Sequence, residues 1–223
     1  GLRANNKFEY MSLYGGEDYR EWLVTLPDYQ PSRFTPHFTE RNVLVHFRTK
    51  ARGDRQGRRL LFIEEVQSDW HQRAARRDGP TQALVPPAPF RKEWSLLALK
   101  LLLLHAVDGD YDGLAWSPAA VQRMRYGCAT EPILRLYDHT LGEHLQRLSA
   151  PWGGRLDTGT IETKEPWIHP RRAGDYWSVA DRSGRFVTRN RLSKAEAIAL
   201  CDRHSKAIEL TVPVFPIPGP MRA

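Results

Sequence analysis

The sequence predicts an α/β protein of the α+β kind, with a mixed, largely antiparallel sheet and a long buried helix that crosses between two strands. Three observations predict this fold. Two apolar segments, 42–49 and 60–67, flank a short glycine-containing loop, which is typical of an antiparallel hairpin. Segment 90–107 is apolar on nearly every side, which indicates a buried helix. Another strand-like segment, 111–116, follows, so strand, helix and strand predict a crossover between parallel neighbours.

The composition is typical of a soluble globular protein. The 223 residues are 41% hydrophobic and 26% charged, with a mean hydropathy of -0.55, which fits one large domain or one domain with an appendage. No apolar run is long enough to span a bilayer, and the N-terminus lacks the apolar region of a signal peptide. Cys128 and Cys201 form no zinc or redox motif. We therefore expect a cytoplasmic protein that makes no membrane contact.

The chain is expected to form a core and a small insertion. The core domain covers 1–154, a ββα insertion covers 155–205, and 206–223 returns to the core as a final strand and tail. Strands are predicted at 19–26, 160–163 and 207–212, in addition to those above. A helix is predicted at 131–148, and a hairpin with strands 176–179 and 186–188 is turned at Ser183-Gly184. Ser193 begins the helix that completes the insertion.

The segment Leu60–Gln72 is the centre of the predicted site, because two glutamates at the end of a core strand are costly unless they are paired or used. Strict alternation places Glu64 on one face of the strand and Glu65 on the other, so at most one of them faces a given pocket. Asp69 and Gln72 have the spacing of a capping box at the start of the next helix.

The ends of the two parallel strands should converge. Ser117 and Pro118 start a helix after strand 111–116, and ligands bind outside the carboxyl ends of such strands. We expect one pocket lined by Glu65, Gln67, His71, Trp116, Gln122, Arg125 and Tyr126. Ser68, Asp69 and Trp70 complete the candidate binding residues. The alternative is a structural network in which Arg125 pairs with Glu65 and Asp69 caps the helix. Glu65, Asp69 and His71 are metal-ligand types, but their directions diverge, so no metal site is predicted.

The basic balance predicts a polyanionic partner, because the chain carries a formal charge of +7 and a pI near 9.6. The hairpin loop supplies the candidate nucleic-acid-binding residues Arg52, Arg55, Arg58 and Arg59. Basic and aromatic residues also alternate at Arg52–Phe62 and Trp167–Trp177, as phosphate contacts and base stacking require. The alternative is a solvated hairpin tip. In the helix 90–107, Leu97, Leu101 and Leu104 are predicted to lie in the core.

Several blocks of the chain resemble a domain found in phage and prophage proteins, often within very large polypeptides called polyvalent proteins. The most specific block is Glu-Glu-Val-Gln-Ser-Asp-Trp-His at 64–71, within 62–72. The others are 15–21, 42–46, 88–90, 97–100, 111–116, Gln122 with Arg125-Tyr126, and 136–138. The resemblance spans most of the chain and implies a phage or prophage origin. The family tends to have Thr-Thr-Gly after the position of Trp116, whereas this chain has Ser117-Pro118-Ala119.

The order of elements is also similar to that of the GNAT acyltransferases. That likeness implies a transferase that modifies nucleic acid or a host protein and uses acetyl-CoA as cofactor. Glu64 or Glu65 would be the base and Tyr137 the acid, and His71 is a further catalytic candidate. The phosphate-binding loop of that family is half matched at 76–81, where Pro80 removes an amide.

Two other classes of function stay open. An ADP-ribosyltransferase-like effector would bind NAD through His46 or Arg48 and orient its nucleophile with a glutamate. A non-enzymatic module would bind DNA, RNA or a host protein. The expected ligands, acetyl-CoA, NAD or nucleic acid, distinguish the three classes.

Overall fold

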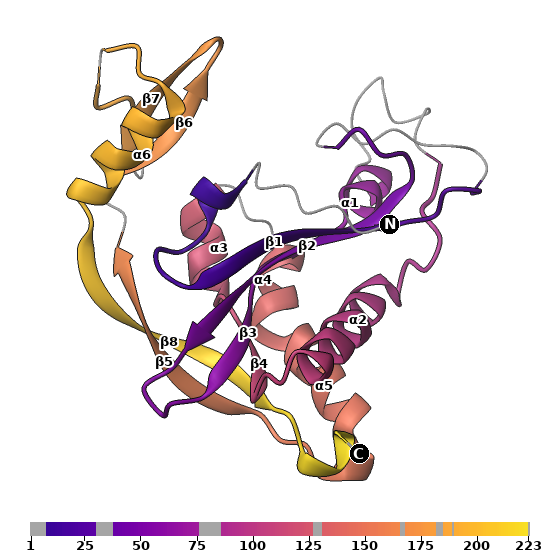
Figure 1. Ribbon diagram of the computed structural model, residues 1–223. Coiled ribbons are helices and arrows are strands. Elements are labelled where there is room, and N and C mark those ends of the chain that lie inside the picture. The colour runs from indigo at the N-terminus through magenta and orange to yellow at the C-terminus, as the bar shows by residue number, and fades with distance from the viewer. Residues whose placement is uncertain are drawn as a thin grey trace.

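A computed structural model gives the structure of residues 8–29, 38–75, 86–126, 131–165, 168–181, 185–188 and 190–222 (Figure 1). The main sheet has six strands in the order β1-β2-β3-β4-β8-β5. Their bounds are β1 Glu17–Thr25, β2 Val43–Gly53, β3 Arg59–Gln67, β4 Gly113–Trp116, β5 Asp157–Glu165 and β8 Lys206–Pro216. The helices are α1 Asp69–Ala75, α2 Trp94–Asp108, α3 Ala119–Tyr126, α4 Glu131–Arg135, α5 Leu141–Ser149 and α6 Lys194–Arg203. The short helices are η1 Glu9–Met11, η3 Leu136–Thr140, η4 Ala150–Trp152 and η5 Gly219–Met221.

The sheet is mixed and largely antiparallel, which confirms the predicted fold class. Strands β1, β2 and β3 are antiparallel neighbours, β3 and β4 are parallel, and β4, β8 and β5 are again antiparallel. Helix α2 lies in the crossover between β3 and β4, as the apolar segment predicted. The likeness to GNAT acyltransferases stays a prediction.

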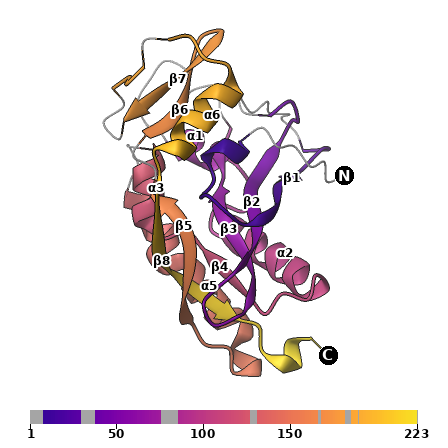
Figure 2. The same ribbon diagram turned by 60° about the vertical axis from the view of Figure 1, so that its left-hand side comes forward.

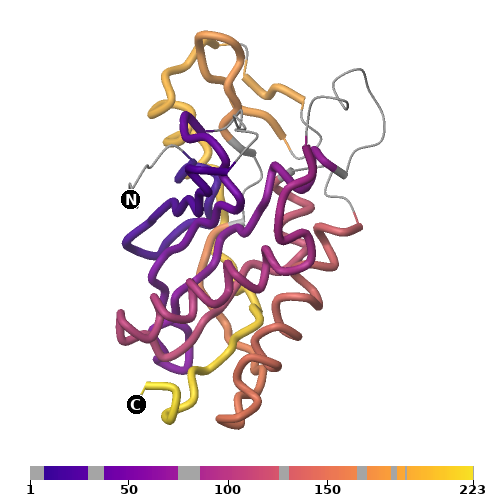
Figure 3. Tube along the Cα trace, turned by 90° about the vertical axis from the view of Figure 1, so that its right-hand side faces the viewer, coloured from indigo at the N-terminus to yellow at the C-terminus, as the bar shows by residue number. Residues whose placement is uncertain are grey.

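Helices α2 and α5 cover one face of the sheet (Figure 3). Their core includes Leu99 and Leu102 of α2, Leu145 of α5, and Leu61 and Ile63 of β3. The segment predicted as one helix is continuous but contains one wider turn, η3, a π-helix between α4 and α5. Such turns free one backbone carbonyl for another donor. Among the residues that the structure describes, no helix is long and apolar enough to cross a membrane.

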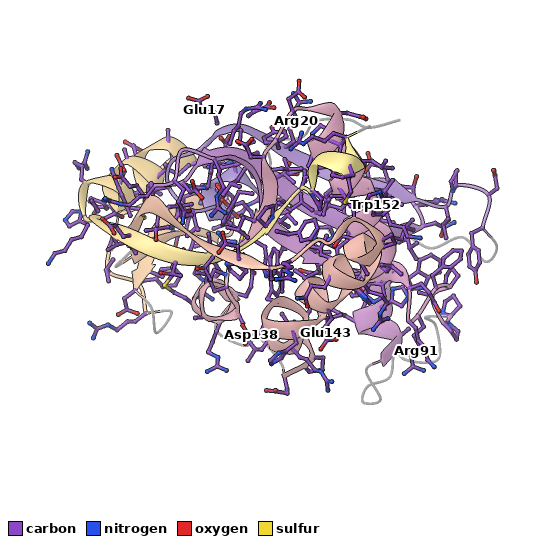
Figure 4. All side chains as sticks on the ribbon, turned by 90° about the horizontal axis from the view of Figure 1, so that it is seen from below. Glu17, Arg20, Arg91, Asp138, Glu143 and Trp152 are labelled. Atoms are coloured by element: carbon purple, nitrogen blue, oxygen red, sulfur yellow. The ribbon has the colours of Figure 1, made fainter. Side chains whose placement is uncertain are left out.

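Helix α2 is less buried than its sequence predicts. Leu97 is half-buried, and the exposed fractions of Leu101 and Leu104 are 37% and 61%. The expectation that all three lie in the core is therefore wrong for Leu101 and Leu104. The sheet and α5 cover two sides of α2, and these two leucines lie on the remaining side. Exposed charged side chains, including those of Glu17 and Arg20 on β1, project outward around the core (Figure 4).

The other face of the sheet is curled and holds a second core. The backbone of Arg55, at the tip of the β2–β3 hairpin, donates to the carbonyl of Thr160 on the edge strand β5 (2.9 Å). The curl encloses an apolar cluster that includes Leu60, Phe62 and Val214. Residues 8–16, which we call the crossing segment, pass over this face and insert Leu13 into the cluster (Figure 2).

A small ββα unit lies beyond the ends of β5 and β8 (Figure 1). Strands β6 Ile168–Ala173 and β7 Tyr176–Asp181 form a hairpin, and α6 packs on it through Val179, Ala197 and Cys201. Helix α6 begins at Ser193, as predicted, and the structure adds a capping box that Ser193 forms with Glu196. The expected start of the insertion at 155 was wrong, because β5 pairs with β8 over nine residues in the main sheet. The predicted turn at Ser183-Gly184 lies outside the described residues.

Candidate functional site

A β-bulge sets the directions of the two glutamates at the end of β3. Arg48 of β2 pairs with Glu65, but the next residue, Thr49, pairs with Ile63, so Glu64 is the extra residue. An extra residue interrupts alternation. Both carboxylates therefore meet basic residues from alternate positions of β2, on the face opposite the helices. The predicted opposite directions of Glu64 and Glu65 were wrong for this reason.

The side chain of Glu64 is fully buried and held by basic residues from two directions. Arg52 of β2 donates to its carboxylate at 3.3 Å, and Arg125 of α3 forms a shorter ion pair. The backbone amide of Leu13, in the crossing segment, also donates to it (3.1 Å). Burial alone would raise the pKa of Glu64, but Arg125, Arg52 and this amide together hold it below its usual value. Glu64 is therefore a poor general base near neutral pH.

The backbone carbonyl of Glu64 collects three more donors. Ser117 Oγ (3.0 Å), Gln122 Nε2 (2.9 Å) and Arg125 Nη1 (2.7 Å) all donate to this oxygen. Strand β3 continues past the end of β4, so Ser117 after β4 and two side chains of α3 replace the missing strand neighbour. The expected convergence of β3 and α3 occurs, but Arg125 pairs with Glu64 and not with Glu65.

Glu65 belongs to a second ion pair on the same face. Its carboxylate lies 2.7 Å from Arg48 Nη2 and 3.5 Å from His46 Nε2. All three side chains are buried. We call the alternate β2 residues His46, Arg48, Lys50 and Arg52 the cation row.

The crossing segment covers the cation row with backbone carbonyls. Arg48 donates to the carbonyl of Phe8 (3.2 Å). Lys50 donates to the carbonyls of Leu13 and Gly15, and Arg52 to those of Leu13 and Tyr14. Gly15 and Gly16 have φ angles of 76° and 78°, and a Cβ on Gly16 would lie about 3.0 Å from the side chain of Arg52. Glycine is thus required where the segment turns against the row. Carbonyls and carboxylates together compensate these buried cations.

The polar residues that follow β3 form hydrogen bonds around the start of α1. Ser68 Oγ accepts from the amide of His71 (3.4 Å), so Ser68, and not Asp69, occupies the capping position. Asp69 accepts from Gln67, and the indole of Trp70 donates to the carbonyl of Pro86. The His71 ring lies between Ser68 Oγ (2.7 Å) and the carbonyl of Pro89 (3.0 Å). Burial lowers the pKa of His71.

Tyr137 is in a position unsuited to the acid role. Its hydroxyl accepts from the amide of Val66 (2.8 Å) and donates to the carbonyl of the same residue (3.1 Å). Its backbone carbonyl, in the wider turn η3, accepts from the indole of Trp116 (2.9 Å). Burial raises the pKa of Tyr137 well above its usual range. The hydroxyl is thus committed to the end of β3, and Trp116 faces the helix-side core.

The predicted pocket residues therefore divide into separate groups. Gln122 and Arg125 meet at Glu64, His71 stacks on Trp94, and Trp116 joins the helix-side core. The side chain of Tyr126 lies outside the described part of the chain. Within that part, no group of three His, Cys, Asp or Glu residues is placed to hold a metal ion.

The four candidate arginines of the hairpin are each engaged within the protein. Arg52 pairs with Glu64, and Arg55 with Glu162 and Glu209. Arg58 pairs with Asp54 and Asp157, both at 2.7 Å. Arg59 donates to the carbonyl of Gly109 (2.5 Å) and lies over the ring of Tyr111. The hairpin tip is exposed to solvent, as the alternative predicted, but its arginines contact acceptors within the protein.

A cavity of about 560 Å³ lies between this hairpin, the start of β1 and β5. Three of the same arginines line it, but so do three carboxylates, those of Glu17, Asp54 and Glu162. Opposite charges in equal number do not favour a polyanion. The cavity does not restore the predicted nucleic-acid contact at the hairpin.

The ββα unit is the most basic part of the chain, and the sequence analysis singled out only its start, at Trp167–Trp177. Segment 168–206 contains nine Lys and Arg residues but four Asp and Glu residues, and so carries five of the seven excess charges. A count of charge by segment, instead of over the whole chain, would have identified this concentration of positive charge.

No family model matches this sequence, and comparisons with curated proteins and with solved structures find no significant match.

Proposed function

We propose that this protein binds nucleic acid through the ββα unit. The observation that carries the proposal is the concentration of excess positive charge in segment 168–206. Phosphate contacts supply much of the affinity of proteins for nucleic acids, and a basic face is their usual footprint. The hairpin is the weaker candidate, because Arg52 is buried against Glu64 and the other three arginines contact carboxylates or a carbonyl of the protein.

One face of the unit points away from α6; Ser178 and Ala180 on this face are buried, whereas Phe186 on it is exposed. Trp177, Val179 and Leu192 pack toward α6. Residues at the alternating positions of β7 therefore point to the opposite face, which we call the outer face. Arg171 of β6 pairs with Ser178, and Phe186 forms a bridge with Ala180, so both belong to the outer face.

Arginine and aromatic side chains form this outer face. The guanidinium of Arg171 lies 5.3 Å from the ring centre of Phe186, and that of Arg191 lies 4.6 Å from the ring centre of Tyr176. Phe186 is 49% exposed. Guanidinium groups that stack on rings keep their N–H donors at a fixed orientation, which suits bidentate contacts with phosphate oxygens.

The carboxylates near these arginines do not neutralise the surface. Asp181 lies 3.6 Å from Arg185 and Asp175 lies 3.5 Å from Arg191, and the two arginine side chains are 82% and 71% exposed. Ion pairs this exposed are weak and give way to solvent or to a competing anion. The core arginines differ, because buried carboxylates and carbonyls surround them.

A binding assay with matched charge changes tests the proposal. The triple variant Arg171→Gln, Arg185→Gln, Arg191→Gln removes three charges from the unit. The control Arg123→Gln, Arg135→Gln, Arg147→Gln removes three exposed charges from the helices of the core. Fluorescence anisotropy would follow binding to labelled DNA and RNA, single-stranded and duplex, between about 50 and 200 mM salt.

We expect the first variant to lower the slope of log affinity against log salt by about three, because each lost phosphate contact removes about one. The control should keep the wild-type slope. Thermal denaturation should show both variants folded, since exposed substitutions usually change stability by less than about 0.5 kcal/mol. Equal losses in the two variants, or no binding of any probe by the wild type, would contradict the proposal.

A GNAT-like transferase that modifies nucleic acid or a host protein is the second candidate. The observation that favours it is the parallel pair β3 and β4, joined through α2 and flanked by antiparallel strands. Against it, Glu64 and Tyr137 are buried and committed to other bonds, and the cation row that would hold NAD in the alternative effector is covered. Thermal shift with acetyl-CoA and with NAD tests both, since a ligand at about 100 times its Kd adds about 2.7 kcal/mol of stability.

A further inference from the structure

We infer that two copies of this protein associate through the outward side of α2, with the two helices antiparallel and related by a two-fold axis. The inference does not depend on nucleic-acid binding. It follows from a row of leucines that the core leaves uncovered and from the charges at the two ends of the same helix.

The outward side of α2 carries Leu97, Leu101 and Leu104, which we call the leucine row. Their spacing of four and three residues places them along one side of the helix. Leu97 is half-buried, and the exposed fractions of Leu101 and Leu104 are 37% and 61%. Figures 1 and 2 show α2 at the outer margin of the molecule. A surface helix normally carries polar residues on its solvent side, so a row of exposed apolar residues marks an interaction face.

The charged residues at the ends of α2 mostly have signs that do not suit the helix itself. Arg91 and Lys92 precede the first turn, where the helix dipole favours negative charge. Asp108 is the last residue of α2 and Asp110 lies two residues beyond it, where the dipole favours positive charge. These four residues are exposed, and so is Glu93, whose sign does suit its end. An antiparallel helix brings its opposite end to each position and complements both.

A second α2 provides the apolar surface that the leucine row requires. With the two-fold axis beside Leu101, Leu104 of each copy faces the space between Leu97 and Leu101 of the other, as helix packing favours. The exposed Lys100 lies beside the row, where its aliphatic stem covers apolar surface and its ammonium group reaches solvent. The row therefore complements itself, as an isologous interface must.

The same register pairs the charged ends. Lys92 of one copy lies level with Asp110 of the other, and Asp108 of that copy is two residues, or about 3 Å, away along the helix axis. The two-fold axis repeats this contact at the other end, so each dimer contains it twice. A second copy thus satisfies both the apolar row and the charges beside it.

The contact between the two helices is small. The 15 residues of α2 make a helix about 22 Å long, so the interface lies at the lower end of the range for specific association. We therefore expect a reversible dimer whose population rises with protein concentration.

Sedimentation velocity measures this association. Wild type should change from the 25.7 kDa chain to a species of twice that mass as its concentration rises through the micromolar range. Leu104→Glu should weaken association at least about a hundredfold, because each dimer would bury two unpaired carboxylates. The control Val187→Glu makes a similar change at an exposed residue of the ββα unit and should leave association unchanged. Circular dichroism should show both variants folded, since exposed substitutions change stability little.

Exchange of charges tests the antiparallel arrangement. Lys92→Glu alone places like charges together at both ends of the dimer, and so does Asp108→Lys alone, so each should weaken association at least about tenfold at low salt. An equimolar mixture of the two variants restores one opposite pair at each end of the mixed dimer, and it should associate as tightly as wild type. A parallel arrangement gives no such rescue, because residue 92 would then lie beside residue 92.

The outcomes decide the inference either way. A concentration-dependent dimer that Leu104→Glu removes and that the mixture of charge variants restores supports it. A wild type that stays monomeric overturns it, and would mean that a different partner covers the leucine row or that solvent does. A dimer that persists in Leu104→Glu, an equal loss in Val187→Glu, or a mixture without rescue also overturns it.

Discussion

Basic side chains form two dense groups in this protein, one beneath the crossing segment and one on the ββα unit. In the first, Arg48, Lys50 and Arg52 are buried, and carboxylates from β3 and carbonyls from residues 8–15 take up their hydrogen bonds. In the second, Arg185 and Arg191 are exposed, and their carboxylate neighbours lie at 3.6 and 3.5 Å. The comparison teaches that the environment of a basic residue, and not its presence, decides whether its charge is available to a partner.

The largest expected effect on stability comes from removing a carboxylate from the buried group. Glu64→Gln leaves Arg52 and Arg125 without their shared carboxylate, and removal of one partner of a buried pair costs about 3–5 kcal/mol. Urea denaturation measures this loss in the free energy of unfolding. The control Glu162→Gln removes an exposed carboxylate that also pairs with an arginine, and should cost less than about 0.5 kcal/mol. Similar costs for the two variants would show that burial makes no difference.

Acid should remove part of the same stabilisation. Because the pKa of folded Glu64 lies below its ordinary value of 4.5, its contribution is complete above that pH and is lost as pH falls through the folded pKa. The difference in unfolding free energy between wild type and Glu64→Gln should therefore narrow below about pH 4.5. Denaturation curves for both proteins over this range provide the measurement. A difference that stays constant or widens in acid would contradict the ion pairing of Glu64.

The smallest effect concerns the link between the two groups. Tyr10, in the crossing segment, meets Trp177 of β7 edge to face at 4.9 Å. A double-mutant cycle with Tyr10→Ala and Trp177→Ala should give a coupling energy of about 0.5–1.5 kcal/mol. Tyr10→Ala with Trp152→Ala, on a distant exposed turn, is the control and should be additive. A coupling near zero in the first cycle would mean that the crossing segment does not connect core and unit.

The predictable parts of the fold were those with local signals. The β2–β3 hairpin has a glycine-containing loop between apolar segments, helix α6 of the ββα unit has a serine at its start, and the crossover follows from the order of the elements. Strand β5 was assigned to the insertion, because its partner β8 lies some forty residues further along the chain. The position of a strand in a sheet cannot be predicted when its partner is distant in the sequence.

The candidate site was less predictable for a related reason. Alternation is a property of one strand, whereas the bulge at Glu64 exists only in the register of β3 against β2. The choice of Arg125 for Glu64 over Glu65 depends on that bulge. Arg52 looked like a loop residue because its acceptors, the carbonyls of Leu13 and Tyr14, come from the start of the chain. The sequence identified several residues that lie in the same region, but it did not predict which of them contact each other.

The pairing of β5 with β8 determines where the ββα unit can be replaced by another segment. Glu165 and Lys206 are direct partners in this pairing, so the chain leaves the main sheet and re-enters it at adjacent positions. A two-residue hairpin turn bridges the same gap. The ββα unit is therefore an insertion in what would otherwise be an ordinary hairpin, and another module of similar end spacing could replace it without a change in the strand pairing of the main sheet.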